Sequence, residues 1–350
     1  MSDQVRAALA AVIDGQTLTL DEARGAMGSV MDGEATPAQL AALLVALRMR
    51  GETVEELAGF AAAMRERVVH VDAPDGIVDT CGTGGDGSGT FNISTTAALV
   101  VAACGVPVAK HGNRAITSAS GSADVLDALG VRIDHDAASA GAALRGIGFA
   151  FMFAPGFSPA MKHAGPTRRE IGVRTAFNLL GPLTNPAGAR RQVVGVADAA
   201  AAPRIAAVLH LLGVDRALVV GGDGIDELPL DGSGVIHDVT PEGIERRTVD
   251  TVALGLTKAS AAKLAGGSPA DNARIVESVL RGEPGARRDV VLLNAAAGLV
   301  AAGRVADLAE GIDLAALTID AGLATELLEG LRAERRASEV ARATAEGAPA

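Results

Sequence analysis

The chain has 350 residues, of which 49% are hydrophobic, with 42 acidic and 31 basic side chains and a formal net charge of −11. This length accommodates two ordinary domains, while the negative charge and the lack of Trp and Tyr argue against binding to nucleic acid. No apolar run approaches the roughly 18 uninterrupted residues of a membrane span.

The N-terminal segment MSDQVRAALAAVIDG lacks the basic start and the continuous apolar stretch of a secretory signal, so we expect a cytoplasmic protein. Two cysteines, Cys81 and Cys104, are too few for a disulfide framework and have no zinc-ligand spacing. We expect them to be buried thiols.

The first 73 residues are expected to form a small helical domain. Three capping boxes, in which Thr is followed three residues later by Glu or Gln, predict helix starts at Thr19, Thr36 and Thr53. Leucines spaced by three and four positions between residues 40 and 47 give one helix an apolar face.

Residues 74–340 are predicted to form a larger α/β domain with a mainly parallel sheet, because short apolar runs alternate with helical segments. The predicted strands are GIVDT, VPVAK, VRI (131–133), FAFMF, RQVVGVA and RALVVGG. Residues 166–180 are expected to form one helix, and the segment 166–185 to return to the helical domain. The chain is predicted to be largely helical from residue 268 and to end in a flexible tail at 341–350.

A glycine-rich segment follows the first of these strands, at residues 79–96. It has five glycines within eight residues and leads into a helix start, so that backbone N–H groups and the helix N-terminus can converge on phosphate oxygens. The spacing Gly82-x-Gly84-x-x-Gly87 matches the dinucleotide fingerprint, but three residues separate it from the helix and no acidic residue lies about 20 positions beyond. A Walker loop is excluded, because no Lys-Ser or Lys-Thr follows Gly87. An ordinary turn between strand and helix is the remaining alternative.

Lys110 ends the next predicted strand, and a polar loop that contains glycine follows it. At that position its ammonium group would face the same crevice as the glycine-rich segment and contact phosphate. His111 comes next, but no carboxylate stands at a useful spacing from it, so we interpret it as structural, like the other five histidines.

Two further motifs carry charge. Asp226 and Glu227 follow an apolar strand and a Gly-Gly turn, and an acid pair at that place predicts a magnesium site. Arg168 or Arg169, at a predicted helix start, could bind a substrate carboxylate with two parallel hydrogen bonds; a surface ion pair with Glu170 is the alternative.

Six segments in this order resemble the anthranilate phosphoribosyltransferase family: GTGGD (82–86), NIST (92–95), KHGNR (110–114), SGSADVL (120–126), FNLLGPLTNP (177–186) and DGIDEL (223–228). The resemblance covers residues 1 to about 330. It implies a fold of the thymidine-phosphorylase type and an Mg²⁺-dependent cytoplasmic homodimer of tryptophan biosynthesis. Its substrates would be phosphoribosyl diphosphate and anthranilate.

The resemblance also assigns roles to residues. Those implied to bind phosphoribosyl diphosphate are Gly82, Gly85, Asp86, Thr90, Asn92, Ile93, Ser94, Thr95, Lys110, Gly112, Asn113, Ser118 and Ser122. Those implied to bind anthranilate are Gly82, Asn113 and Arg168. Ser94, Asp226 and Glu227 are implied to bind the metal, and Lys110, Asp226 and Glu227 to act directly in catalysis.

One position departs from the family pattern. Ser158 stands where a His is expected before the Pro-Ala-Met-Lys segment, which leaves the preferred acceptor open. The alternatives are a nucleoside phosphorylase, a transferase for another aryl amine or nucleobase, and a non-catalytic ligand-binding homologue. The acid pair favours an enzyme that binds a diphosphate with a metal ion over a nucleoside phosphorylase, which uses free phosphate.

Overall fold

A bundle of four helices forms the N-terminal part of the protein, in a computed structural model that describes residues 2–115, 119–222 and 224–346. These are α1 (Asp3–Ile13), α2 (Leu20–Met31), α3 (Pro37–Arg50) and α4 (Val54–Arg65). Each of Thr19, Thr36 and Thr53 forms the reciprocal pair of hydrogen bonds of a capping box, so the three predicted helix starts are confirmed.

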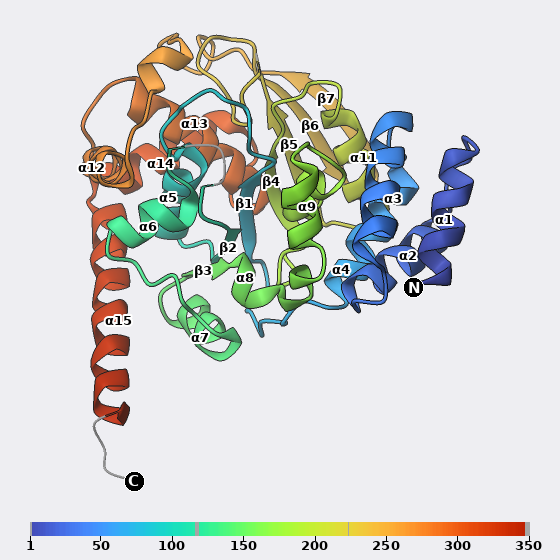
Figure 1. The fold of residues 1–350 in the computed structure, drawn as a ribbon. Coiled ribbons are helices and arrows are strands. Elements are labelled where there is room, and N and C mark those ends of the chain that lie inside the picture. The colour runs from blue at the N-terminus through green and yellow to red at the C-terminus, as the bar shows by residue number, and fades with distance from the viewer. Residues whose placement is uncertain (1, 116–118, 223, 347–350) are drawn as a thin grey trace.

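A seven-stranded sheet lies beside this bundle, in the order β3-β2-β1-β4-β5-β6-β7 (Figure 1). Its strands are β1 (Val78–Gly82), β2 (Val108–Gly112), β3 (Phe149–Phe153), β4 (Arg191–Gly195), β5 (Arg216–Gly221), β6 (Val235–Thr240) and β7 (Gly243–Thr248). The first five strands of this order are parallel, and β6 and β7 add an antiparallel hairpin at one edge. The sheet is therefore mainly parallel, as predicted.

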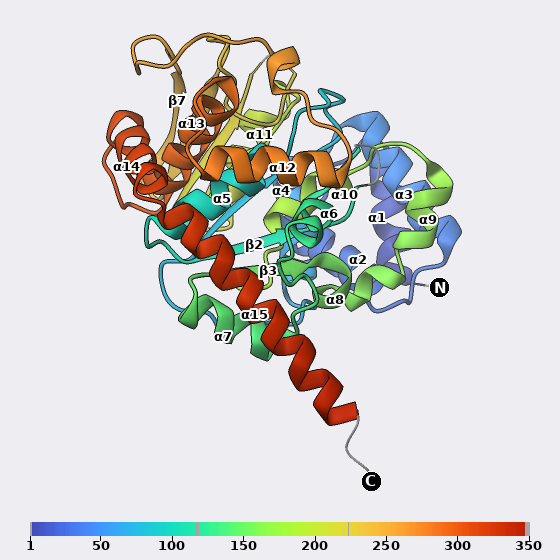
Figure 2. The same cartoon turned by 90° about the vertical axis from the view of Figure 1, so that its left-hand side faces the viewer.

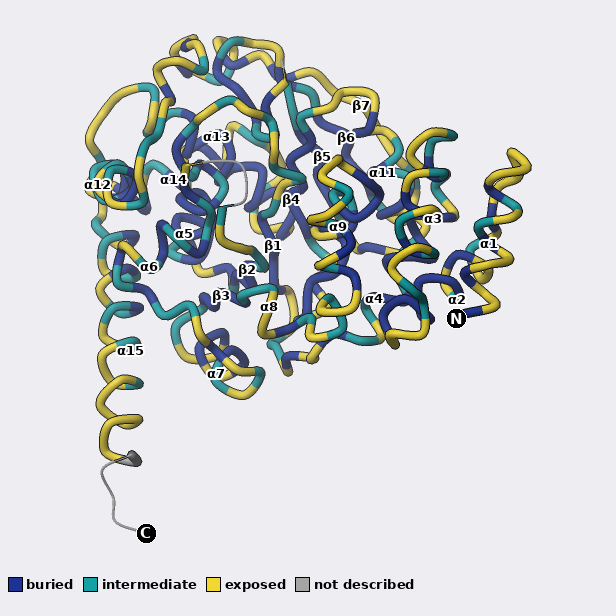
Figure 3. The backbone as a smooth tube through the Cα atoms, in the orientation of Figure 1, coloured by how far each residue is buried: buried dark blue, intermediate teal, exposed yellow. Residues whose placement is uncertain are grey.

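Helices cover both faces of the sheet, and most residues of its strands other than β7 are buried (Figure 3). One face packs on a core that includes α5 (Ile93–Ala103), α6 (Ser122–Ala128), α12 (Pro269–Leu280), α13 (Ala286–Ala301), α14 (Leu308–Asp320) and α15 (Leu323–Glu346). The other face shares a core with α11 (Ala202–Leu211), α10 (Phe177–Leu180) and the four-helix bundle. Because this second core is continuous, the bundle is packed against the sheet.

The remaining elements are short. Helices α7 (Ala137–Gly146) and α8 (Ala154–Phe157) contact β3, and α9 (Gly165–Ile171) contacts α3. Three 3₁₀ turns complete the fold: Pro159–Lys162, Gly181–Leu183 and Ala261–Leu264. Within the described residues, no helix has the length and apolar composition needed to cross a membrane.

Two predicted elements differ from the structure. Residues 131–133 form no strand; the carbonyl oxygen of Val131 accepts a hydrogen bond from Arg335 of α15 at 3.2 Å instead of pairing with a strand. The single helix expected at 166–180 is divided, because Gly172, which follows the end of α9, is left-handed (φ 68°) and a helix resumes only at Phe177. Its two parts do pack on the bundle, α9 on α3 and α10 on α4, as expected.

At the C-terminus, α15 continues through Glu346, into the segment for which a flexible tail is predicted. Its last turns extend away from the body of the molecule (Figures 1 and 2). The two cysteines are unpaired; Cys104 is buried, whereas Cys81 is only partly buried.

Candidate active site

The carboxyl ends of four parallel strands meet at one edge of the sheet. β1, β2, β4 and β5 end at Gly82, Gly112, Gly195 and Gly221. The glycine-rich segment leads out of β1, the loop with Asn113 follows β2 and the acid pair follows β5, whereas Arg168 comes after β3. The chain leaves β1 toward β2 and β3 and then returns to β4 on the other side of β1. In such sheets, the crevice beyond the strands at this reversal is the usual place for a ligand.

Asp226 lies against the glycine-rich segment in this crevice. Its Oδ2 accepts a hydrogen bond from the N–H of Gly84 at 2.8 Å. A Cβ on Gly82 would lie 2.4 Å from this carboxylate, and one on Gly195 would lie 1.7 Å from the Asp226 carbonyl oxygen. Since Gly82 and Gly195 are paired in the sheet, two adjacent glycines provide the space that Asp226 occupies.

Glu227 contacts the first turn of α5. Its Oε1 accepts from the N–H of Ser94 at 2.9 Å. Asn92, at the N-cap position, makes no capping bond, because its side chain donates to the Ser120 carbonyl (3.1 Å) and accepts from Asn272 (2.9 Å). The Ser94 N–H, in the first turn of α5, is thus bonded to the acid pair rather than to a capping side chain.

Both acids carry raised pKa values. Burial, and then the negative charge of Asp86, raise the pKa of Asp226 to about 6. Burial and the charge of Asp226 raise the pKa of Glu227 to about 8. Two desolvated carboxylates that repel each other form a favourable environment for a cation.

Asp226 and Glu227 suit Mg²⁺ better than a metal ion whose ligands all come from the protein. Among the described residues, no cluster of three His, Cys, Asp or Glu side chains is arranged to hold a metal ion. Mg²⁺ commonly takes one or two carboxylates and completes its shell with water and substrate phosphate oxygens. Asp226 and Glu227 therefore fit Mg²⁺ that is brought with a phosphorylated ligand.

Lys110 lies beneath the glycine-rich segment and is only 2% exposed. Its Nζ donates to the carbonyl oxygen of Thr80 in β1. Burial lowers the pKa of Lys110, while the charges of Asp79, Glu227 and Asp226 act in the opposite direction. The ammonium group is thus bonded to β1 and interacts electrostatically with the acid pair, while its contact with phosphate stays a prediction.

Asp79 and Asn185 support this lysine, although the sequence analysis assigned a role to neither. Asp79 is fully buried and accepts from Asn185 Nδ2 at 2.7 Å and from the N–H of His111 at 3.3 Å. Burial raises the pKa of Asp79, against the effect of Lys110. Asn185 and Pro186 end the FNLLGPLTNP motif, and this Asn-Pro pair is the sequence feature that could have pointed to Asn185.

The remaining residues expected to bind phosphoribosyl diphosphate lie around the same strand ends. Asp86 accepts from the N–H of Ser88 at 3.2 Å, and a Cβ on Gly112 would lie 2.5 Å from Ser122 Oγ. Ile93 and Thr95 are buried, so at the start of α5 their backbone groups are better placed for a ligand than their side chains. Gly85 and Thr90 lie in the glycine-rich segment, and Ser118 is outside the described residues.

Arg168 lies on α9, with its guanidinium carbon 4.7 Å from the centre of the Phe177 ring. Burial lowers its pKa. No carboxylate among the described residues pairs with it, so the alternative ion pair with Glu170 does not form. Asn113 is exposed in the loop after β2.

His111 has a buried ring whose Nε2 has no partner among the described residues. Burial is the main reason that its pKa falls to about 4, so the ring is neutral near pH 7. His111 therefore adds no positive charge to the crevice.

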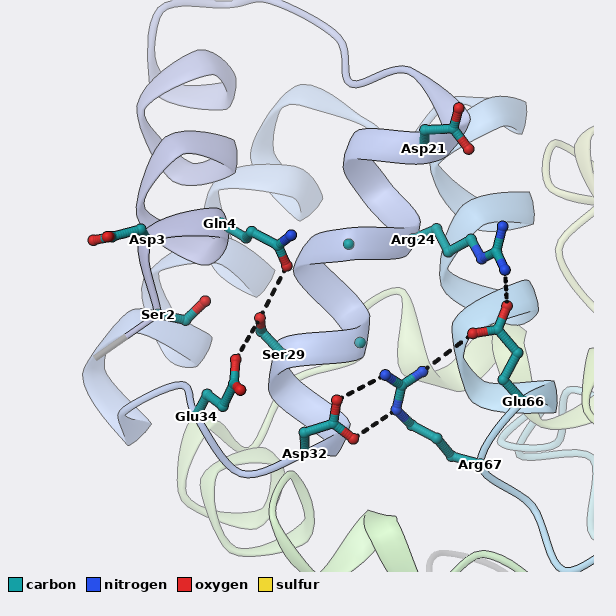
Figure 4. Close-up of a pocket in the computed structure, with 12 residues that line it drawn as sticks. Ser2, Asp3, Gln4, Asp21, Arg24, Ser29, Asp32, Glu34, Glu66 and Arg67 are labelled. Atoms are coloured by element: carbon teal, nitrogen blue, oxygen red, sulfur yellow. Dashed lines mark hydrogen bonds and ion pairs between the residues drawn. The ribbon is translucent and has the colours of Figure 1, made fainter.

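A hollow of about 930 Å³ elsewhere in the helical bundle is a weaker candidate (Figure 4). Its two arginines are already paired: Arg67 with Asp32 and Glu66, and Arg24 with Glu66. It lies away from the strand ends and from the N–H groups that open α5.

Comparison with known proteins identifies the relatives of this architecture. Residues 6–68 match the model of the helical bundle domain of a glycosyl transferase family, and residues 74–325 match the model of its a/b domain. The anthranilate phosphoribosyltransferase of Pelotomaculum thermopropionicum is 51% identical over 329 residues, which is 93% of this chain and 95% of that one. That of Chloroflexus aggregans is 53% identical over 335 residues, or 95% and 98% of the two chains.

Solved structures agree with these relatives. The anthranilate phosphoribosyltransferase of Thermus thermophilus superposes with a TM-score of 0.88 at 46% identity, over 94% of this chain and 99% of that one. The Saccharomyces cerevisiae enzyme in complex with phosphoribosyl diphosphate and Mg gives 0.88 at 26% identity, over 96% and 99% of the two chains. The chain therefore belongs to the glycosyl transferase family that joins a helical bundle domain to an α/β domain, and within it to the anthranilate phosphoribosyltransferases.

Proposed function

We propose that this protein transfers the 5-phosphoribosyl group of phosphoribosyl diphosphate to the amine of anthranilate and releases diphosphate, the second step of tryptophan biosynthesis from chorismate. The observation that carries the proposal is the meeting of glycine-rich backbone, the start of α5, Lys110 and an acid pair at one crevice. The Saccharomyces cerevisiae relative has been solved with phosphoribosyl diphosphate and Mg, and also with 4-fluoroanthranilate.

The diphosphate is proposed to lie over the glycine-rich segment and the start of α5. Backbone N–H groups there, together with Lys110, would bind its oxygens, and Asp226 and Glu227, with the Ser94 hydroxyl, would hold Mg²⁺. When bound, Mg²⁺ would supply positive charge to the diphosphate oxygens. The other residues proposed to bind phosphoribosyl diphosphate are those assigned by the resemblance, among them Gly85, Asp86 and Asn92.

The chemistry calls for little acid–base catalysis, because an aryl amine is neutral near pH 7 and already has its lone pair available. Its nitrogen bonds to the anomeric carbon as the bond from that carbon to diphosphate breaks, and the nitrogen then loses one proton to solvent. The difficult part is the departure of the diphosphate. Lys110 and the loop N–H groups would stabilise the charge that develops on it.

Arg168 is proposed to bind the carboxylate of anthranilate, with Asn113 and Gly82 as its other contacts. The guanidinium is partly buried and no described residue gives it a carboxylate partner, so a ligand carboxylate would offset its desolvation. Arg168→Ala is expected to raise the KM for anthranilate about 10-fold to 100-fold, because a charge-assisted bidentate pair is lost. The KM for phosphoribosyl diphosphate should change less than about twofold.

Steady-state kinetics with each substrate varied in turn measure this difference. Arg169→Ala, the exposed neighbour on α9, is the matched control and should leave both constants close to those of the wild type. Equal increases in both constants for Arg168→Ala would show that the assignment of the two substrates is wrong.

We propose further that the helical part (1–73 with 166–185) and the α/β part (74–340) form two domains around the cleft, in a cytoplasmic homodimer. Ile13, Val45, Met49 and Val173 are exposed apolar side chains on or next to α1, α3 and α9, which pack together. A second copy would cover this surface. Light scattering should give the mass of a dimer for the wild type and a lower mass for Met49→Lys. A monomeric wild type, or a variant with the mass of the wild type, would contradict the proposed dimer.

The reaction itself is tested by the fluorescence of anthranilate, which should disappear when the purified protein is mixed with phosphoribosyl diphosphate and Mg²⁺. EDTA should stop the loss and added Mg²⁺ restore it. Metal-independent cleavage of thymidine or uridine would favour a nucleoside phosphorylase. No turnover with any acceptor would favour a non-catalytic homologue. Turnover of another aryl amine, with none of anthranilate, would indicate that Ser158 changes which acceptor the enzyme prefers.

A further inference from the structure

Arg174 connects the helical side of the molecule to the glycine-rich segment. It lies between α9 and α10, which pack on α3 and α4. Its Nη1 donates to the carbonyl oxygens of Gly84 at 2.9 Å and of Gly85 at 3.0 Å. We propose that Arg174 is a positioning residue, which fixes this loop so that its N–H groups face the diphosphate site.

The backbone conformation makes the contact specific. Gly84 (φ 62°) and Gly85 (φ 69°) are both left-handed. In a helical turn the carbonyl groups leave on one side and the N–H groups on the other, so a cation bound to the carbonyls orients the N–H groups away from itself. The N–H of Gly84 indeed points to Asp226, at 2.8 Å. Arg174 and Asp226 thus hold the loop from opposite sides.

Gly85 could not be another residue while this contact exists. A Cβ there would lie 2.3 Å from Arg174 Nη1, and its left-handed backbone disfavours any L side chain. The glycine therefore serves the approach of the guanidinium as well as the turn.

The described surroundings of Arg174 offer no interaction that competes with its hydrogen bonds to the loop. No carboxylate among the described residues forms an ion pair with Arg174. A cavity of about 300 Å³ beside it is lined by Thr83, Gly85 and Asp86 of the loop, by Arg48 of α3 and by Arg204 of α11. In this cavity Arg204 donates to the carbonyl oxygen of Glu52, so Arg174 is the cation bonded to the glycine turn.

This inference rests on the proposed function only for the identity of the ligand. The first test compares Arg174→Ala and Arg174→Lys with the control Arg145→Ala. Arg145 is another exposed arginine, on α7, which donates to the carbonyl oxygen of Asp72 at 2.8 Å and pairs with its carboxylate at 3.1 Å. For Arg174→Ala we expect the KM for phosphoribosyl diphosphate, and its Kd measured by calorimetry with Mg²⁺, to rise about tenfold. The KM for anthranilate should stay within about twofold, since no acceptor contact is removed.

Arg174→Lys should recover most of the affinity, because an ammonium group can donate to both carbonyls. Arg145→Ala should match the wild type. Equal changes in both Michaelis constants, or no recovery with Lys, would overturn the proposal in favour of a general effect on folding or on the acceptor.

A second measurement needs no ligand. Amide hydrogen exchange across residues 82–90 of the free protein should be faster in Arg174→Ala than in the wild type or in Arg145→Ala, with the rest of the chain unchanged. Unchanged exchange in this segment would overturn the proposal. If the wild type bound no phosphoribosyl diphosphate, the proposed function would fail, while the exchange result would still decide the role of Arg174.

Discussion

Replacing Asp226 by Asn together with Glu227 by Gln is expected to lower Mg²⁺-dependent turnover about 10²-fold to 10³-fold, which is the usual cost of losing one preorganised electrostatic contact in a transition state. In the wild type the carboxylates accept hydrogen bonds from the N–H groups of Gly84 and Ser94, and the amide oxygens of the variant can accept the same bonds. The loops should therefore keep their positions while the charge that binds the metal is lost.

The same double variant should be at least as stable as the wild type when no metal is present. Burial and mutual repulsion raise the pKa of Asp226 to about 6 and that of Glu227 to about 8, so ionisation of these side chains costs free energy in the folded state. That cost grows as the pH rises from the ordinary carboxyl pKa range toward these raised values, and neutral amides remove it. Thermal unfolding at pH 8 in EDTA measures the effect, which distinguishes a functional defect from misfolding.

Asp250→Asn is the matched control for this variant. Asp250 also accepts backbone N–H groups, those of Val252 and Ala253, but in an exposed turn. It should keep wild-type turnover and metal dependence. Turnover by the double variant at the wild-type rate, with the same Mg²⁺ requirement, would show that the acid pair does not bind the metal.

The second large effect is expected for Lys110→Gln, which should lower kcat/KM for phosphoribosyl diphosphate about 10²-fold or more. Glutamine can still donate to the Thr80 carbonyl oxygen, as Lys110 does, but it brings no positive charge to the departing diphosphate. It also leaves Asp79 and Glu227 without the buried cation that faces them, so some loss of stability should accompany the kinetic defect.

Kinetics at a temperature well below the unfolding transition of the variant separate the two effects. Lys258→Gln, at an exposed lysine, is the control and should leave kcat/KM unchanged. A Lys110→Gln protein that remains folded and works within about threefold of the wild type would remove Lys110 from the proposed mechanism.

Local signals explain which parts of this fold the sequence predicts well. A capping box consists of residues three positions apart, so Thr19, Thr36 and Thr53 mark their helices without reference to the rest of the chain. The buried parallel strands are short apolar runs, and their order along the chain identifies the α/β class. His237 and Asp238 interrupt the apolar residues of β6, and β7 is largely polar, so neither strand has such a run; β6 is held by pairing with β5, and β7 by pairing with β6.

The site shows the same division. Glycines, a strand-end lysine and an acid pair are visible in the sequence because each follows a recognisable strand. Asn272 and Arg174 are not, since they reach the site from α12 and from the segment between α9 and α10, and only packing shows what they touch. The error at residues 131–133 has the same origin, because α15 supplies the partner of that backbone from about 200 residues away.

The most direct test is a crystal structure of the protein with phosphoribosyl diphosphate and Mg²⁺. Diphosphate oxygens should lie within hydrogen-bond distance of the N–H groups of the glycine-rich segment and of Lys110, and Asp226 and Glu227 should coordinate the metal, directly or through water. A ligand bound at another surface, with these groups still bonded only to one another, would contradict the account.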